Sequence, residues 1–237
     1  MRKRIRISIG VLGALLMVST MATQAGELAS LTSRFPEPAP PPNGEAQWVA
    51  QSMRMNGLPM TIKAFKTSAD VDEVINFYEH WWRAKGKADY TRSRRDEWSI
   101  LGIKTDEHYI TVQARSTLGG SEGTIAVSAD PRTVKRVATR FPHPKSSTVV
   151  TLQEYEDFGV QSEHITLLSQ RSASTEAREF ANMLVRGGWQ LVLDRRATKT
   201  QGHIIEVQKD AQHAQLSFLP GRDLGATTAV TVVWKKS

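Results

Sequence analysis

The sequence predicts an α+β fold: a tandem duplication of a ββαβββ unit, with a mainly antiparallel sheet and one helix per unit. Two observations predict it. Two amphipathic helical patterns lie about a hundred residues apart, each after an alternating, strand-like segment. Short motifs also return in the same order with offsets of 101–106 residues. Arg34–Pro38, for example, returns as Arg140–Pro144. A fixed offset over several matches favours a duplicated unit.

Residues 1–25 have the features of a secretory signal peptide. Four basic residues lie within positions 2–6, an apolar run covers 7–18, and Thr23-Gln24-Ala25 has small residues at the spacing of a cleavage site. We expect cleavage after Ala25, with Ala22 as the alternative. The apolar run is shorter than the roughly 20 residues of a membrane span. An uncleaved signal is therefore the one expected route to a membrane.

The charge and the cysteine content exclude several classes of protein. Four of the 31 basic residues lie before Glu27, which leaves 27 basic and 24 acidic residues after the signal. A surplus of three is ordinary, so the high overall charge does not indicate a nucleic-acid-binding protein. There is no cysteine, which excludes disulfides and thiolate metal sites. The exported chain must therefore be held together by its core.

Residues 26–46 are expected to form a proline-rich arm or linker, because five prolines fall within positions 36–42. The first repeat unit is placed at 47–130. It opens with a hairpin over 47–66, since Asn56-Gly57 between alternating segments is a strong type I′ turn signal. After a helix, strands are expected at 89–94, 97–104, 108–115 and 124–129.

The helix of the first unit is predicted over 68–86. Its apolar residues follow the 3.6-residue period, with Ser68 as the expected N-cap and Gly86 at the end. The period places Trp81 in the core and Trp82 at the edge of the apolar stripe. A sugar-binding platform of these two tryptophans is the weaker alternative.

The second unit is placed at 140–237, after a basic connection at 131–139. Its helix buries a stripe from Ala177 to Val185 and ends at Gly187-Gly188. Arg-Phe-Pro-x-Pro stands at the head of each unit. We therefore expect Phe35 and Phe141 to anchor matching arms on the two units.

One motif suggests catalysis, but its context argues against it. Gly119–Gly123 matches G-x-S-x-G, in which a serine on a strand-to-helix turn is the nucleophile of a hydrolase. Here the following residues are strand-like, so a glycine-rich hairpin turn explains the motif better, and a Ser121 hydrolase is a remote alternative. The six histidines show no metal-ligand spacing. We predict no catalytic residue, metal or cofactor.

Two arginine pairs are the candidate ligand-binding residues. Arg94 and Arg95 follow the first helix, and Arg195 and Arg196 follow the second. Guanidinium groups placed together by pseudo-symmetry suit bidentate binding of a carboxylate or phosphate between the units. Charged edge strands that prevent aggregation are the other explanation.

The sequence favours an exported, non-enzymatic protein, periplasmic or secreted, that binds another cell-envelope or secretion-apparatus protein. Small α+β units with edge strands suit protein docking by strand addition, and 47–55 and 227–235 are the strands expected to offer it. The alternative is a periplasmic binding module for an anionic small molecule or glycan, held by the paired arginines.

Overall fold

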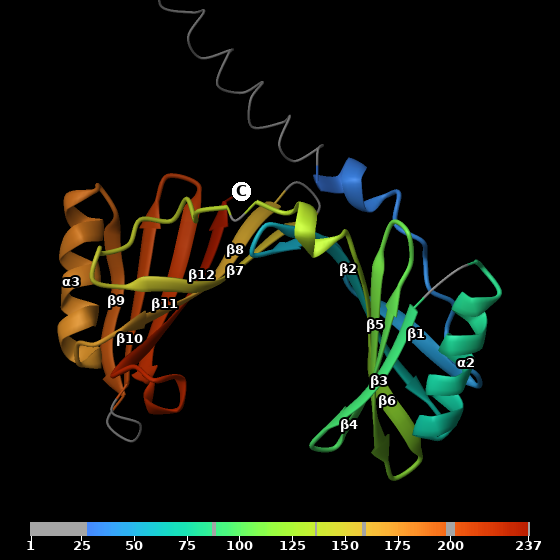
Figure 1. The fold of residues 1–237 in the computed structure, drawn as a ribbon. Helices are drawn as coiled ribbons and strands as arrows, with labels where there is room; N and C mark the ends of the chain where they lie inside the picture. The colour runs from blue at the N-terminus through green and yellow to red at the C-terminus, as the bar shows by residue number, and fades with distance from the viewer. Residues whose placement is uncertain (1–27, 87–88, 136, 158–159, 198–201, 237) are drawn as a thin grey trace, which may run out of the picture.

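The predicted fold class is wrong, because a computed structural model shows mostly one antiparallel sheet of twelve strands, closer to all-β than to α+β (Figure 1). The structure describes residues 28–86, 89–135, 137–157, 160–197 and 202–236. The strand order is β3-β4-β5-β6-β2-β1-β7-β8-β12-β11-β10-β9. The expected signal peptide, 1–25, lies outside the described residues.

The order of elements is the same in the two halves: two strands, a helix and four strands. The four strands after α2 match the four segments expected there, and they are one more than the ββαβββ unit contains. The first half contains β1 (Gly44–Met55), β2 (Leu58–Thr67), α2 (Val71–Arg83), β3 (Asp89–Arg95), β4 (Trp98–Lys104), β5 (Tyr109–Thr117) and β6 (Gly120–Ser128). The 3₁₀ turn η1 (Pro131–Thr133) follows. The second half contains β7 (Thr148–Asp157), β8 (Val160–Ser169), α3 (Ala173–Arg186), β9 (Gln190–Ala197), β10 (Gly202–Lys209), β11 (Gln212–Pro220), the 3₁₀ turn η2 (Arg222–Leu224) and β12 (Thr228–Lys236).

The two halves share one sheet because β1 pairs with β7 at its end. The paired residues are Met53–Met55 on β1 and Gln153–Tyr155 on β7. Asn56 extends the join, since its backbone N–H donates to the carbonyl of Leu152 at 2.7 Å. Pairing between strands a hundred residues apart leaves no local sequence pattern, so the sequence left open whether the two units pack as one body or sit as separate domains.

A short helix covers 28–32 near the N-terminus, while α2 and α3 cover the same face of the sheet and lie on the outer flanks of an arch (Figure 1). Each half has its own apolar core between its helix and its strands, and the largest buried side chains include Tyr78 and Phe180. The sheet therefore has an outer face that α2 and α3 cover and an inner face that they leave uncovered.

The hairpin and the helices form where the sequence predicted them, with three corrections of detail. Val185, which the sequence placed in the buried stripe of the second helix, is 50% exposed. Asn56 and Gly57 have φ of 51° and 86°, as a type I′ turn requires. The N-cap of α2 is Asp70 rather than Ser68, and its carboxylate accepts from the Glu73 N–H at 2.8 Å. Trp82 is 4% exposed and belongs to the core, whereas Trp81 is only partly buried. The expected places of the two tryptophans are thus reversed.

The arms at the heads of the two halves pack on the two cores to different depths. Phe141 is 2% exposed inside the second core, while Phe35 is a partly buried neighbour of the first core. Phe35 meets His108 edge-to-face, with ring centroids 5.1 Å apart. The first arm also touches α2, because the Tyr78 hydroxyl donates to the Ala39 carbonyl at 2.8 Å.

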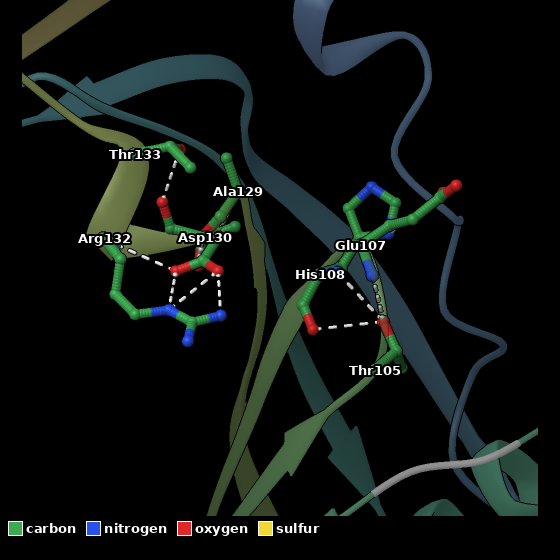
Figure 2. A network of polar contacts seen from close by, with 8 residues as sticks. Thr105, Glu107, His108, Ala129, Asp130, Arg132 and Thr133 are labelled. Atoms are coloured by element: carbon green, nitrogen blue, oxygen red, sulfur yellow. Dashed lines mark hydrogen bonds and ion pairs between the residues drawn. The ribbon is translucent and has the colours of Figure 1, made fainter.

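Polar networks fix the loops at one end of β4, β5 and β6 (Figure 2). In the β4–β5 turn, the Thr105 hydroxyl accepts from the His108 N–H at 2.9 Å. After β6, Asp130 caps η1 by accepting from the Arg132 N–H at 2.9 Å. Hydrogen bonds from the Arg132 guanidinium lower the pKa of Asp130 to about 2. These contacts explain local turn geometry and do not assemble a reactive site.

Candidate functional site

The inner face of the sheet is the face that α2 and α3 leave uncovered. Successive side chains of a strand point to opposite faces of the sheet. The residues buried beneath α2 and α3 lie on the outer face, and the residues directly before and after them in each strand lie on the inner face. On β5, for example, Ile110 and Val112 are buried beneath α2, and Tyr109 and Thr111 lie on the inner face. On β12, Val230 and Val232 are buried, and Thr231 and Val233 lie on the inner face.

Apolar and charged side chains are mixed on this inner face. Several large apolar side chains there are only partly buried, and Leu219 is 45% exposed. Register places the following apolar residues on the inner face: Met60, Ile62, Trp98, Ile100, Tyr109, Tyr155, Leu168, Leu193, Ile204, Leu219 and Val233. Partly exposed apolar side chains between charges are typical of surfaces that dock other proteins.

Aromatic contacts organise the inner face in both halves. In the first half, the Arg115 guanidinium lies 4.9 Å from the Trp98 ring centroid and pairs with Glu97 and Glu122. In the second half, Tyr155 and His164 lie with ring centroids 5.0 Å apart. Burial and the positive charge of Lys235 lower the pKa of His164. These contacts hold flat side chains in fixed positions on the surface, which lowers the entropy lost on binding.

The structure does not bring the two arginine pairs together. Arg94 and Arg95 lie on β3 and Arg195 and Arg196 lie on β9, which are the first and last strands of the sheet. The alternation of the strands also divides each pair. Arg95 and Arg195 fall on the inner face at its two rims, whereas Arg94 and Arg196 fall on the outer face. All four side chains are exposed.

Ser121 is placed for structure and not for nucleophilic attack. It lies on β6 with 1% of its surface exposed, and its hydroxyl donates to the Ala69 carbonyl at 2.9 Å. The glycine-rich segment joins β5 to β6 in a hairpin, rather than a strand to a helix as a nucleophile elbow requires. Gly123 is tightly packed, because a Cβ there would lie 1.8 Å from the Gln113 carbonyl oxygen.

The histidines are dispersed. Within the described ranges, no group of three or more histidine, aspartate or glutamate side chains could hold a metal ion. His108 lies in the β4–β5 turn against Phe35, and burial lowers its pKa despite the opposing charge of Glu107. His203 contacts the carboxylate of Asp194 on the outer face of the sheet.

Of the two strands that the sequence selected for strand addition, β12 is internal, whereas β1 is open on its β7 side over residues 47–52 of the described chain. β12 pairs with β8 and β11 along its length. β1 pairs with β2, and with β7 only at Met53–Met55. The ends of the sheet are β3 and β9, which carry the arginine pairs. The sequence could not identify these edges, because edge position depends on which distant strands pair.

Comparisons of the chain with protein-family models, with curated proteins and with solved structures found no match. In the part of the chain that the structure describes, no helix has both the length and the apolar character needed to span a membrane. The inner face itself was missed at the level of sequence. Its only signal there is the alternation along β5 and β12, which looks the same for a face that water covers and a face that a partner covers.

Proposed function

We propose that this chain is an exported, non-enzymatic protein that binds another component of the cell envelope or secretion apparatus through the inner face of its sheet. One observation carries the proposal: a twelve-stranded sheet with α2 and α3 on one face, and with partly exposed apolar side chains on the other. An antiparallel sheet can keep one face in water, but such a face is usually polar. Here tryptophan, tyrosine, isoleucine and leucine side chains share it with charged residues.

The shape of the sheet suits a partner that enters the arch. The two halves present their inner faces toward the space between them (Figure 1). Arg95 and Arg195 lie at the opposite rims. Aromatic and aliphatic side chains towards the centre, with charges at the margins, form the arrangement of a binding surface whose rim stays in water. The expected partner is therefore a folded protein with an acidic margin around an apolar centre.

Site-specific crosslinking in living cells tests this proposal. A photoreactive residue at Thr111 or at Val233 on the inner face is expected to capture the same protein, because both positions look into the arch. Asp72 on the outer side of α2 is exposed and serves as the matched control.

The variants Ile100→Asp and Val233→Asp place a carboxylate among the apolar residues and are expected to abolish the captured band while leaving the melting temperature within a few degrees of wild type. The proposal fails if the Asp72 probe captures the same protein equally well, or if neither inner-face probe captures any protein. It also fails if both Asp variants retain the full yield of crosslinked product.

A further inference from the structure

The outer face of the second half contains a groove of about 560 Å³ between α3 and the edge strand β9. One stripe of α3 forms its first wall, with Ser174, Arg178, Ala181, Asn182, Val185 and Arg186 at helical spacing. The opposite wall is formed by Leu191, Asp194 and Arg196 of β9 and by His203 of β10. A helix and the last strand of the sheet thus leave an open space between their side chains.

The walls of this groove carry a surplus of positive charge. Arg178, Arg186 and Arg196 face one carboxylate, that of Asp194. Among the described residues none of the three guanidinium groups has an ion pair or a hydrogen bond, while Arg171 nearby is paired with Glu179. Arg178 and Arg186 are two helical turns apart, roughly 12 Å along the axis of α3, and Arg196 lies on the opposite wall. An anion in the groove therefore meets positive charge on both walls, which favours its binding.

His203 keeps the one carboxylate of the groove away from the arginines. The residue is 8% exposed, and its Nε2 contacts the Asp194 carboxylate. His203 is opposite Arg196 in the ladder, and Asp194 lies two residues before Arg196 on the same face of β9. The carboxylate closest in sequence to Arg196 is thereby engaged by the imidazole, and the guanidinium stays available.

The groove also has apolar walls. Val185 is 50% exposed and Leu191 is 42% exposed, and Ala181 lies between the arginine positions of α3. Water covers these aliphatic side chains in the isolated chain. A ligand that covers them gains roughly 25 cal/mol for each Å² of apolar surface that it removes from water.

We propose that this groove binds an organic anion, namely a phosphate or carboxylate group attached to an apolar chain. Guanidinium groups bind such oxyanions through two parallel N–H···O bonds, which fixes both position and orientation. The apolar part of the ligand then lies along Val185 and Leu191. This site is separate from the inner face, because α3 and β9 present it on the opposite side of the sheet.

Isothermal titration of the purified protein with three probes tests the class of ligand. Octyl phosphate, used below its micelle concentration, is expected to bind. Inorganic phosphate, which lacks the chain, is expected to bind at least about tenfold more weakly, and octyl glucoside, which lacks the charge, is expected not to bind. Equal affinity for octyl phosphate and octyl glucoside would overturn the proposal.

Variants locate the site. The double variant Arg178→Ala with Arg196→Ala is expected to raise the Kd for octyl phosphate by at least about tenfold. Arg132→Ala removes an exposed arginine outside the groove and should leave the Kd unchanged. Ala181→Glu should abolish binding by pairing with the groove arginines, and circular dichroism verifies that each variant is folded. An unchanged Kd in both the double variant and Ala181→Glu would rule out the groove.

Vesicles distinguish the two sources of such an anion. A lipid headgroup would be identified if the protein sediments with phosphatidylglycerol vesicles but not with phosphatidylcholine vesicles. The double variant should then fail to sediment with either. Octyl phosphate binding without sedimentation would identify a soluble ligand. A failure of all these probes would leave the crosslinking result from the inner face untouched, so the two proposals can fail separately.

Discussion

The contact between helix and edge strand differs between the two halves, although the elements correspond. Counted from their N-caps, Glu79 on α2 and Ala181 on α3 occupy the same position. Glu79 is hydrogen-bonded to Arg83 at 2.6 Å and to Arg92 of β3, and these three side chains fill the contact. The methyl group of Ala181 is too short to reach β9, and the groove between α3 and β9 stays open. The contact in the first half therefore holds an internal ion pair, whereas the contact in the second half has no carboxylate at the position of Glu79.

The two cores differ in a similar way beneath the helices. Val74 and Glu176 are both fully buried at the same distance from their N-caps. Val74 needs no polar partner, whereas Glu176 accepts from the hydroxyls of Ser147 and Ser169. The two halves therefore share one backbone arrangement but differ in where their polar contacts lie. In the first half the carboxylate of Glu79 is paired near the surface, and in the second half the carboxylate of Glu176 is hydrogen-bonded in the core.

The largest expected effect comes from emptying one core at a time. Trp82→Ala and Phe180→Ala remove side chains that are at most 4% exposed from the first and second core. Each should lower the free energy of unfolding of its own half by roughly 3–5 kcal/mol, because a cavity remains. Scanning calorimetry should show one transition shifted and the other retained. Equal displacement of the whole profile by both variants would show that the halves unfold as one unit.

The next largest effect is expected for Glu176→Val, which copies the first half into the second. The two serine hydroxyls lose their acceptor, and each buried hydroxyl without a partner costs roughly 1–3 kcal/mol. We expect a net loss of about 2 kcal/mol after the gain from an apolar side chain. Urea denaturation measures the change, and Val74→Ala is the control for volume alone. A stabilised Glu176→Val variant would contradict the role given to the serines.

A smaller effect is expected for Glu79→Ala, which copies the second half into the first. Arg83 and Arg92 are 61% and 50% exposed, so water screens their pairing, and the cost should be about 1 kcal/mol or less. The two arginines then lose their internal anion. Titration with octyl phosphate should show a second binding event that wild type lacks. A single event with unchanged stoichiometry would show that Ala181 alone does not explain the groove.

The smallest effect is a loss of stability in mild acid, from one histidine in each half. Burial lowers the pKa of His108 and of His164 below the ordinary 6.5, so the folded state favours the neutral ring. The unfolded chain therefore binds more protons, and this stabilisation is complete above 6.5 and is lost as the pH falls through the lowered pKa values. The melting temperature should fall between about pH 8 and about pH 5.

The variants His108→Gln and His164→Gln separate the two contributions to this pH dependence. Each should reduce the slope of melting temperature against pH without removing it. A slope that neither variant changes would show that other groups cause the loss.

Local elements were predictable because their signals are local. The Asn56-Gly57 turn, the helical period of α2 and the alternation along β5 all depend on residues close in the chain, and the structure contains each of them. The sequence placed both arginine pairs after each helix and the strand that follows it, and the structure has them within those strands, near the ends of β3 and β9.

Tertiary relations were not predictable in the same way. The pairing of β1 with β7 joins three residues on each side and changed the fold class, yet no motif marks it. The groove lies beside Ala181, which the sequence correctly assigned to the core stripe, and beside Arg178 and Arg186, which look like ordinary exposed helix residues. The separation of Arg95 from Arg196 follows from strand order and from alternation, which must both be known before facing side chains can be paired.

The short join between β1 and β7 has a mechanical consequence. Most strand pairs in the sheet are connected by six to nine matched residues, but the halves are connected by three. Force that spreads the two rims apart is therefore concentrated on Met53–Met55, Gln153–Tyr155 and the Asn56–Leu152 contact. We expect the sheet to open there before either core is disturbed, so that a change in the angle between the halves costs less than unfolding one of them.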